Sequence, residues 1–171
     1  FKVFSWSDQE YYNEGDKIIA SFQARTPNGN PVKGKGTVSL YEIKYNKDLK
    51  PSEKKIHSEK LETDFNGKSE YKLNAPKSGQ YRLSFELKND KGDEEEGAVM
   101  FNVYGNDQEK NDLRFNDIEI LTKESEYKPG ETVNLKINTN ANGSTVLLFL
   151  RPENDIYPEP EILNLKNKSI D

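Results

Sequence analysis

Residues 79–87 read Gly-Gln-Tyr-Arg-Leu-Ser-Phe-Glu-Leu and are the clearest indication of fold class in the sequence. Its apolar side chains occupy every second position: Tyr81, Leu83, Phe85 and Leu87. Successive side chains of a β-strand point to opposite faces of the sheet, so this alternation predicts a strand with one buried face. We expect that face to share a core with Phe22 and Leu40 from neighbouring strands.

The same period of two recurs on both sides of this stretch. Between residues 1 and 104, the predicted strands are 1–6, 17–25, 37–45, a weak strand from Ile56 to Leu61, Tyr71–Leu73, 81–87 and 99–103. Residues 47–55 are predicted to form a polar loop, and residues 89–96 a hairpin loop. About seven short strands with regular turn signals and no helical period predict an all-β fold, an immunoglobulin- or fibronectin type III-like β-sandwich.

A second unit follows a polar segment. Residues 105–112 contain no hydrophobic side chain, so we expect a first domain over 1–105, a linker over 106–112 and a second unit over 113–171. Apolar positions in the second unit predict about four strands, near residues 113–120, 133–137, 146–150 and 162–165, with a loop over 151–160. Since a sandwich of this class has about seven strands, we expect two tandem units, the second incomplete.

An internal repeat supports this division. Residues 12–18 read Tyr-Asn-Glu-Gly-Asp-Lys-Ile, and residues 127–133 read Tyr-Lys-Pro-Gly-Glu-Thr-Val. A tyrosine, a glycine turn, an acid and an alternating strand thus recur after 115 residues, which is a domain-sized spacing rather than that of a solenoid repeat. We expect the glycine to permit the turn and the acid to accept its backbone N–H groups.

Composition excludes several classes of function. Hydrophobic residues make up 32% of the 171 residues, and no apolar run approaches the length of a membrane span. The net charge of −5 does not favour nucleic acid. Without cysteine and with a single histidine, the chain has no disulfide, no thiolate nucleophile, no thioester and no Cys- or His-rich metal site. We therefore expect no enzyme activity, no catalytic residues, no metal site and no cofactor.

Single residues that could carry chemistry have simpler interpretations. His57 has no second histidine or cysteine to act with, and we interpret it as a solvent-facing strand residue. Residues 90–96 are acidic but lack the ligand spacing of a calcium loop, which favours an acidic hairpin tip. Asn142 and Asn167 begin N-glycosylation triplets that are frequent by chance. The segment from Gly79 to Leu83 is typical of the tyrosine corner of immunoglobulin-like sandwiches.

These motifs, taken together, resemble the alpha-2-macroglobulin family. Residues 125–133 and the apolar run 146–150 look like the start of its bait-region-containing segment. Residues 29–32, 38–41, 75–82 and 101–105 are similar to a macroglobulin-like domain of the bacterial branch. The resemblance implies a non-catalytic scaffold fragment of a protease-trapping, endopeptidase-inhibiting protein of the cell envelope, extracellular or periplasmic. The family's reactive thioester needs a cysteine, which this chain lacks.

The resemblance also implies the partners. These are the neighbouring domains of the parent protein and, through that parent, proteases. We expect neither nucleic acid nor direct membrane insertion. The incomplete second unit is also expected to allow self-association through an edge strand. The N-terminus lacks a signal-peptide pattern, so we expect the chain to begin inside a longer protein. The alternative is a cell-surface adhesin or carbohydrate-binding module, in which exposed aromatic residues stack on sugars. Its candidate residues are Trp6, Tyr11, Tyr41 and Tyr45.

Overall fold

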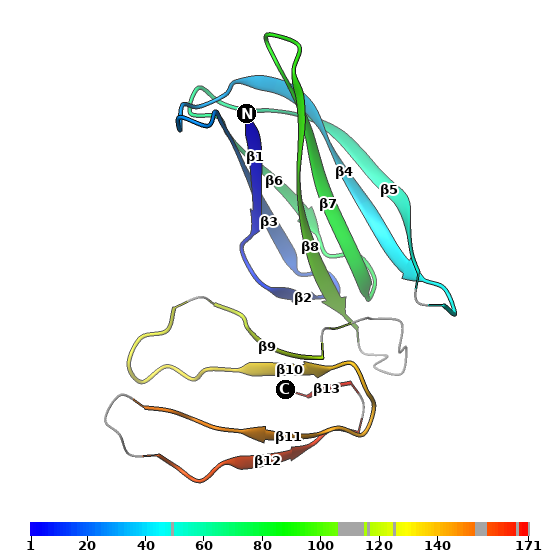
Figure 1. Cartoon of the computed structure of the whole chain (residues 1–171), viewed down its shortest axis with the longest axis vertical. Helices are drawn as coiled ribbons and strands as arrows, with labels where there is room; N and C mark the ends of the chain where they lie inside the picture. The colour runs from blue at the N-terminus through cyan, green and yellow to red at the C-terminus, as the bar shows by residue number, and fades with distance from the viewer. Residues whose placement is uncertain are drawn as a thin grey trace. The chain divides into compact units, whose positions relative to one another are not determined.

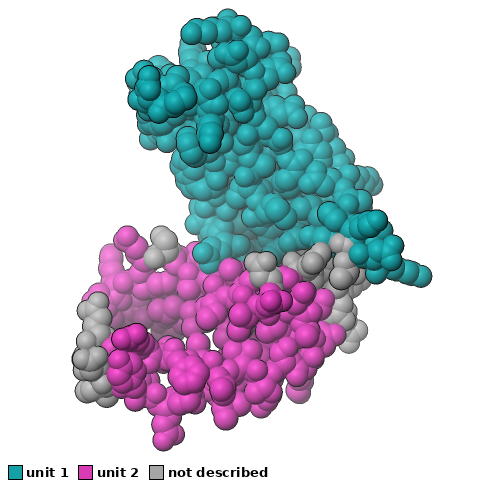
Figure 2. Space-filling model, viewed as in Figure 1, with its two compact units in different colours: residues 1–106 teal, residues 107–171 magenta. Residues whose placement is uncertain are grey.

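The structure is a computed structural model that describes residues 1–48, 50–105, 115, 117–124, 126–152, 157–166 and 168–170. All regular secondary structure in these residues is β-strand, which confirms the all-β expectation. The chain divides into two compact units, unit 1 (Phe1–Asn106) and unit 2 (Asp107–Asp171), shown in Figure 2. The predicted linker 106–112 lies outside the described residues.

Unit 1 contains eight strands among its described residues, arranged in two sheets. They are β1 (Lys2–Ser7), β2 (Tyr11–Asn13), β3 (Lys17–Arg25), β4 (Gly34–Tyr45), β5 (Pro51–Glu62), β6 (Lys68–Asn74), β7 (Gly79–Asn89) and β8 (Glu94–Tyr104). One sheet has the order β1-β3-β6 and the other β2-β8-β7-β4-β5 (Figure 1). Neighbouring strands are antiparallel except β2 and β8, which are parallel.

The two sheets of unit 1 enclose one hydrophobic core. The predicted core residues are all buried: Tyr81, Leu83, Phe85, Leu87, Phe22 and Leu40. Phe22 comes from the three-stranded sheet and Phe85 from the five-stranded sheet, and their ring centroids lie 5.1 Å apart. Packing between inward-facing side chains of two antiparallel sheets is the pattern of an immunoglobulin-like β-sandwich.

Three details of unit 1 correct the sequence predictions. The three-residue strand β2 was not predicted, so the unit has eight strands rather than about seven. The loop prediction over residues 47–55 is wrong from Pro51 onward, because β5 begins there and pairs with β4. Nearly every β5 side chain is exposed, so the strand lacks the alternation that would reveal it. The hairpin loop is also shorter than residues 89–96, because β7 ends at Asn89 and β8 begins at Glu94.

Unit 2 contains five strands in its described residues. They are β9 (Ile118–Thr122), β10 (Leu135–Thr139), β11 (Thr145–Leu148), β12 (Glu161–Asn164) and β13 (Ser169–Ile170). One sheet has the order β13-β10-β9, and β11 pairs with β12 (Figure 1). The prediction of about four strands missed β13, because a two-residue strand shows no periodicity. The predicted strand over residues 146–150 is also too long, since β11 ends at Leu148.

The internal repeat extends from sequence to strand register. In unit 1, Ser5 of β1 lies opposite Phe22 of β3, and in unit 2, Ile120 of β9 lies opposite Ile137 of β10. Each residue number in the second pair is 115 higher than its counterpart. A slip of one residue would turn every side chain to the other face, so the shared register is a specific likeness.

The order of the strands repeats as well. β6 is the third strand beside β3, and β13 is the third strand beside β10. Between them in the chain stands an antiparallel pair, β4–β5 in unit 1 and β11–β12 in unit 2. Unit 2 therefore matches unit 1 from β1 through β6, with β2 as the one strand that has no counterpart among the described residues.

The cores differ greatly in size. Among the described residues, fifteen buried hydrophobic side chains form the core of unit 1, whereas three form that of unit 2: Ile137, Val146 and Leu165. Leu163 and Ile170 pack against this small cluster. Because burial of apolar surface is the main favourable term in folding, the described part of unit 2 has much less to stabilise it than unit 1.

Candidate functional site

The repeated Tyr-x-x-Gly-acid motif forms the same turn in both units. Gly15 has a φ of 83° and Gly130 a φ of 89°, a left-handed conformation that favours glycine. In each turn the acid accepts a hydrogen bond of 2.8 Å from the backbone N–H three residues earlier: Asn13 to Asp16, and Lys128 to Glu131. This geometry bears out the structural roles predicted for the glycine and the acid.

The tyrosine of the motif also makes a matching contact in both units. The Tyr12 hydroxyl accepts from the Gln9 N–H at 3.1 Å, and the Tyr127 hydroxyl accepts from the Glu124 N–H at 3.2 Å. Tyr12 is buried and donates to Asp8 Oδ1 at 2.6 Å, whereas Tyr127 is half-buried. Burial, with a smaller contribution from Asp8, raises the pKa of Tyr12 to about 12.

Tyr81 forms the predicted tyrosine corner. Its hydroxyl donates to the Lys77 carbonyl oxygen at 2.7 Å, which ties the start of β7 to the preceding loop. A Cβ at Gly79 would lie 3.3 Å from the tyrosine ring, so glycine leaves room for the ring to lie over the turn. Burial, with the nearby charges of Glu42 and Glu14, raises the pKa of Tyr81 to about 12. The prediction of a structural role for this segment is confirmed.

Arg82 organises a charged cluster in unit 1. Its Nε and Nη2 atoms donate to the two carboxylate oxygens of Glu53, both at 2.8 Å, and its guanidinium lies 4.6 Å from the Tyr41 ring centre. Arg82 and Ser84 also donate to Glu96. Arg82 lowers the pKa of Glu53, and Ser84 followed by Arg82 lowers the pKa of Glu96. These contacts link β5, β4, β7 and β8. The Ser84 hydroxyl that donates to Glu96 is buried, so this serine–carboxylate pair does not present a nucleophile to solvent.

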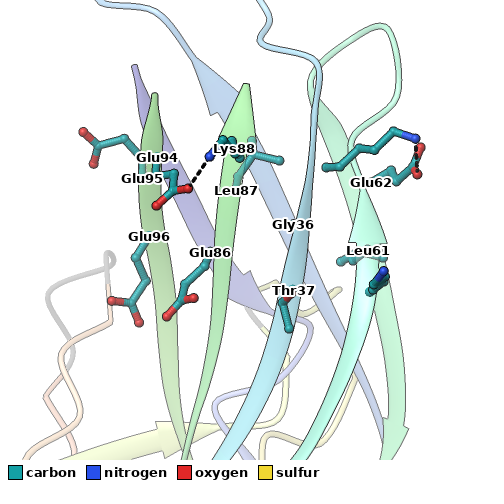
Figure 3. Close-up of a pocket in the computed structure, with 12 residues that line it drawn as sticks. Gly36, Thr37, Leu61, Glu62, Glu86, Leu87, Lys88, Glu94, Glu95 and Glu96 are labelled. Atoms are coloured by element: carbon teal, nitrogen blue, oxygen red, sulfur yellow. Dashed lines mark hydrogen bonds and ion pairs between the residues drawn. The ribbon is translucent and has the colours of Figure 1, made fainter. Parts of the chain in front are cut away.

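A groove of about 750 Å³ lies at one end of the five-stranded sheet (Figure 3). Three consecutive residues from each of four strands line it: 35–37, 60–62, 86–88 and 94–96. Lys88 pairs with Glu94 at 2.8 Å, and Lys35 pairs with Glu62 at 3.2 Å. Sequence analysis missed this groove because four strands that are separated in the chain build it together.

The charges of this groove do not form a chemical site. Glu86 lies directly opposite Glu96 in the β7–β8 register, and like charges in that position repel. Within the described residues, no three His, Asp or Glu side chains are grouped so that they could hold a metal ion. The groove is therefore an open, polar surface with two ion pairs across it.

His57 is an exposed residue of β5, as expected. Its Nε2 atom lies 3.8 Å from Glu59 Oε2, and its ring stacks on Tyr71 with centroids 6.4 Å apart. The Tyr71 hydroxyl donates to the same glutamate at 3.2 Å. The three side chains thus contact one another on the surface of β5 and β6.

The acidic stretch 90–96 is a hairpin tip closed by its own side chains. Asn89 Nδ2 donates to Asp93 Oδ2 at 2.9 Å, and the Asp93 N–H donates back to Asn89 Oδ1 at 2.9 Å. This confirms the hairpin-tip interpretation. The asparagines of the two glycosylation triplets are not both described. Asn142 is exposed in the turn before β11, and Asn167 lies outside the described residues.

The four aromatic residues considered for sugar stacking have different environments. Tyr11 is buried, Tyr41 lies beneath Arg82, and the Tyr45 hydroxyl donates to Gln80 Oε1 at 2.8 Å. Trp6 is 46% exposed on β1. Of these four, Trp6 therefore offers the most open ring.

Comparisons with known proteins give likenesses to solved structures alone. No family model matches the sequence, and no curated protein matches it. Trypsin-activated alpha-2-macroglobulin from Escherichia coli is 12% identical over 96% of this chain and 14% of its own, with a TM-score of 0.44. Spo0M, a sporulation control protein from Bacillus subtilis, is 11% identical over 89% of this chain and 75% of its own, with a TM-score of 0.43.

A cycloisomaltooligosaccharide glucanotransferase from Paenibacillus sp. is 16% identical over 77% of this chain and 16% of its own, with a TM-score of 0.39. The likeness is limited to a β-sandwich fold. At TM-scores of 0.39 to 0.44 it assigns neither a family nor an activity to this chain. Among the described residues, no helix is long and apolar enough to cross a membrane.

Proposed function

We propose that this chain is a non-catalytic scaffold segment built from tandem immunoglobulin-like units. The observation that carries the proposal is the shared register of β1–β3 and β9–β10 at an offset of 115 residues. Tandem copies of one sandwich type lengthen a polypeptide and hold the domains on either side of them apart. The register that the two units share does not involve a catalytic side chain.

The contacts of the polar side chains support this scaffold role. Tyr12 and Tyr81 close turns, and Arg82 links four strands through Tyr41 and two glutamates. In enzymes, side chains with shifted pKa values often gather in a cleft beside a nucleophile or a general base. Here the side chains with shifted pKa values hydrogen-bond to groups that hold turns and strands together.

The parent protein, in this proposal, is a protease-trapping endopeptidase inhibitor of the alpha-2-macroglobulin type in the extracellular or periplasmic cell envelope. The support is the motif resemblance in residues 125–133 and 75–82. The neighbouring domains of that parent are the direct partners, and proteases are met through it. The net charge of −5 does not favour nucleic acid as a partner.

Two measurements test this proposal. The complete reading frame is expected to encode further sandwich repeats and a Cys-Gly-Glu-Gln thioester motif, and a catalytic domain in direct continuity would contradict it. The purified chain is expected to show no hydrolysis of peptide, ester or glycoside substrates and no calcium binding by calorimetry. A micromolar calcium site that disappears in Asp93→Asn would contradict the assignment of residues 90–96 as a simple hairpin tip.

The alternative function, carbohydrate binding, is favoured by one observation. Phe4 and Trp6 lie two residues apart on β1 and both are about half exposed, so their rings occupy the same face of the strand. A glycan array tests this alternative. Binding that is lost in Trp6→Ala and retained in Phe65→Ala, an exposed aromatic away from this strand, would favour a carbohydrate-binding module over a scaffold.

A further inference from the structure

Two large apolar side chains on the inner face of unit 2 are exposed to solvent. Ile120 lies directly opposite Ile137, so the two project from the same face of the sheet, and Ile137 belongs to the core of unit 2. Ile118 is two residues away on the same strand and shares that face. Both Ile118 and Ile120 are nevertheless 53% exposed.

The matching positions of unit 1 are covered by strand β8. Val3 and Ser5 correspond to Ile118 and Ile120 in the shared register. A Cβ added at Gly97 of β8 would lie 2.5 Å from Ser5 Oγ and 2.6 Å from Val3 Cγ1. Glycine at this position therefore allows β8 to lie close against β1.

A second part of unit 2 lacks a neighbour that unit 1 has. β4 pairs with β5 on one side and with β7 on the other, whereas β11 pairs with β12 alone among the described strands. In unit 1, the inward-facing Val38 and Leu40 of β4 lie opposite Phe85 and Leu83 of β7. The free edge of β11 presents backbone N–H and C=O groups to which a strand can pair.

A third difference concerns the strand before the repeated turn. In unit 1, residues 11–13 form β2, which pairs in parallel with β8. The corresponding residues 126–128 of unit 2 form no strand, although the turn after them has the same hydrogen bond. All three features of unit 2 thus correspond to positions that contact β7 or β8 in unit 1. They are the exposed isoleucines, the free edge of β11 and residues 126–128, which form no strand.

We infer that unit 2 binds one antiparallel β-hairpin with the residue pattern of β7–β8. The first strand pairs antiparallel with β11 and places apolar side chains opposite Val146 and Leu148. The second strand crosses Ile118 and Ile120 with a glycine at the closest approach and pairs in parallel with residues 126–128. Since β7 follows β6 after the short connection 75–78, the hairpin enters from the C-terminal side of β13 in the same polypeptide. This inference does not depend on the proposed function.

The test lengthens the whole chain after residue 171 by a copy of its own residues 75–104. Hydrogen exchange is compared with that of the unmodified chain, and sedimentation confirms that each protein is a monomer. The matched control carries Leu83→Ser, Phe85→Ser and Leu87→Ser in the copied segment only, so it keeps the length and the turns but cannot fill the core. The original residues 75–104 of unit 1 remain unchanged in both proteins.

The expected result is exchange slowed by about tenfold or more at Ile118–Thr122 and Thr145–Leu148, and new protection at residues 126–128, in the extended chain but not in its control. If the extended chain fails to fold, a synthetic peptide of residues 79–104 added to the unmodified chain replaces it, with the same expectation. Equal exchange in the extended and control chains, or no effect of the peptide, would overturn the inference. So would a dimer of the unmodified chain that already protects β11.

Discussion

Val3 and Ser5 in unit 1 and Ile118 and Ile120 in unit 2 occupy equivalent positions on equivalent strands, yet their surroundings differ. In unit 1, β8 lies against the two side chains, whereas in unit 2 both isoleucines are half exposed. The pairs β1–β3 and β9–β10 have the same register, although unit 2 has no counterpart of β8 among its described residues. This register therefore does not require a strand in the position of β8. The comparison shows that burial is decided by the later strands of the sandwich.

The largest changes in the free energy of unfolding are expected for substitutions in the two cores. Phe85→Ala should destabilise unit 1 by about 3–5 kcal/mol, because Phe85 is buried among fifteen core residues. Ile137→Ala should destabilise unit 2 by about 2 kcal/mol, near the lower end for such changes, because its cluster has three buried members and can relax.

Trp6, the single tryptophan, reports unfolding of unit 1 by fluorescence, and hydrogen exchange reports unit 2. Phe65→Ala is the control, since Phe65 is 81% exposed and its loss should change the free energy of unfolding by less than about 0.5 kcal/mol. An equal cost for Phe65→Ala and Phe85→Ala would contradict the assignment of the core.

A smaller effect is expected at the contact between β8 and β1. Gly97→Ala should destabilise unit 1 by about 1–3 kcal/mol, because the added methyl group meets Val3 and Ser5 at distances that require β1 to move. Ala98→Ser, at the next and exposed position of β8, should be nearly neutral. Both variants are measured by denaturant unfolding followed through Trp6 fluorescence. A neutral Gly97→Ala would show that β1 is not held tightly against β8.

Alkaline pH should destabilise unit 1 through its two buried tyrosines. The pKa of Tyr12 and of Tyr81 is raised from 10.0 to about 12, so each contributes stability that is complete below pH 10 and is lost as pH rises through about 12. Titration of unfolding by Trp6 fluorescence should show this loss, and Tyr12→Phe should reduce its pH dependence. A flat profile between pH 10 and 12 would contradict the burial of these phenols.

The smallest effect is expected in the repeated turn, where the two units should behave alike. Asp16→Ala and Glu131→Ala each remove a carboxylate that accepts one backbone N–H at 2.8 Å; Asp16 is half-buried and Glu131 is exposed. Each should cost about 0.5–1 kcal/mol, measured by hydrogen exchange of its own unit. A cost confined to Asp16→Ala would show that the turn of unit 2 does not persist in solution.

Sequence patterns predicted the parts of this molecule that alternate or repeat. The period of two in β7 gave its buried face, and the Tyr-x-x-Gly-acid motif gave both turns. β5 escaped prediction because it is exposed along most of its length, and β2 and β13 are too short to show a period. The Arg82 cluster and the groove arise from lateral neighbours, which sequence spacing does not specify.

Interstrand Hα–Hα nuclear Overhauser contacts in unit 2 report strand register in solution, so they are the decisive measurement of the structural repeat. We expect contacts within the register that places Ile120 opposite Ile137 and Leu135 opposite Thr122, matching Ser5 with Phe22 and Ala20 with Ser7 in unit 1. Contacts displaced by one residue would turn Ile118 and Ile120 to the outer face. That result would contradict both the structural repeat and the open inner face of unit 2.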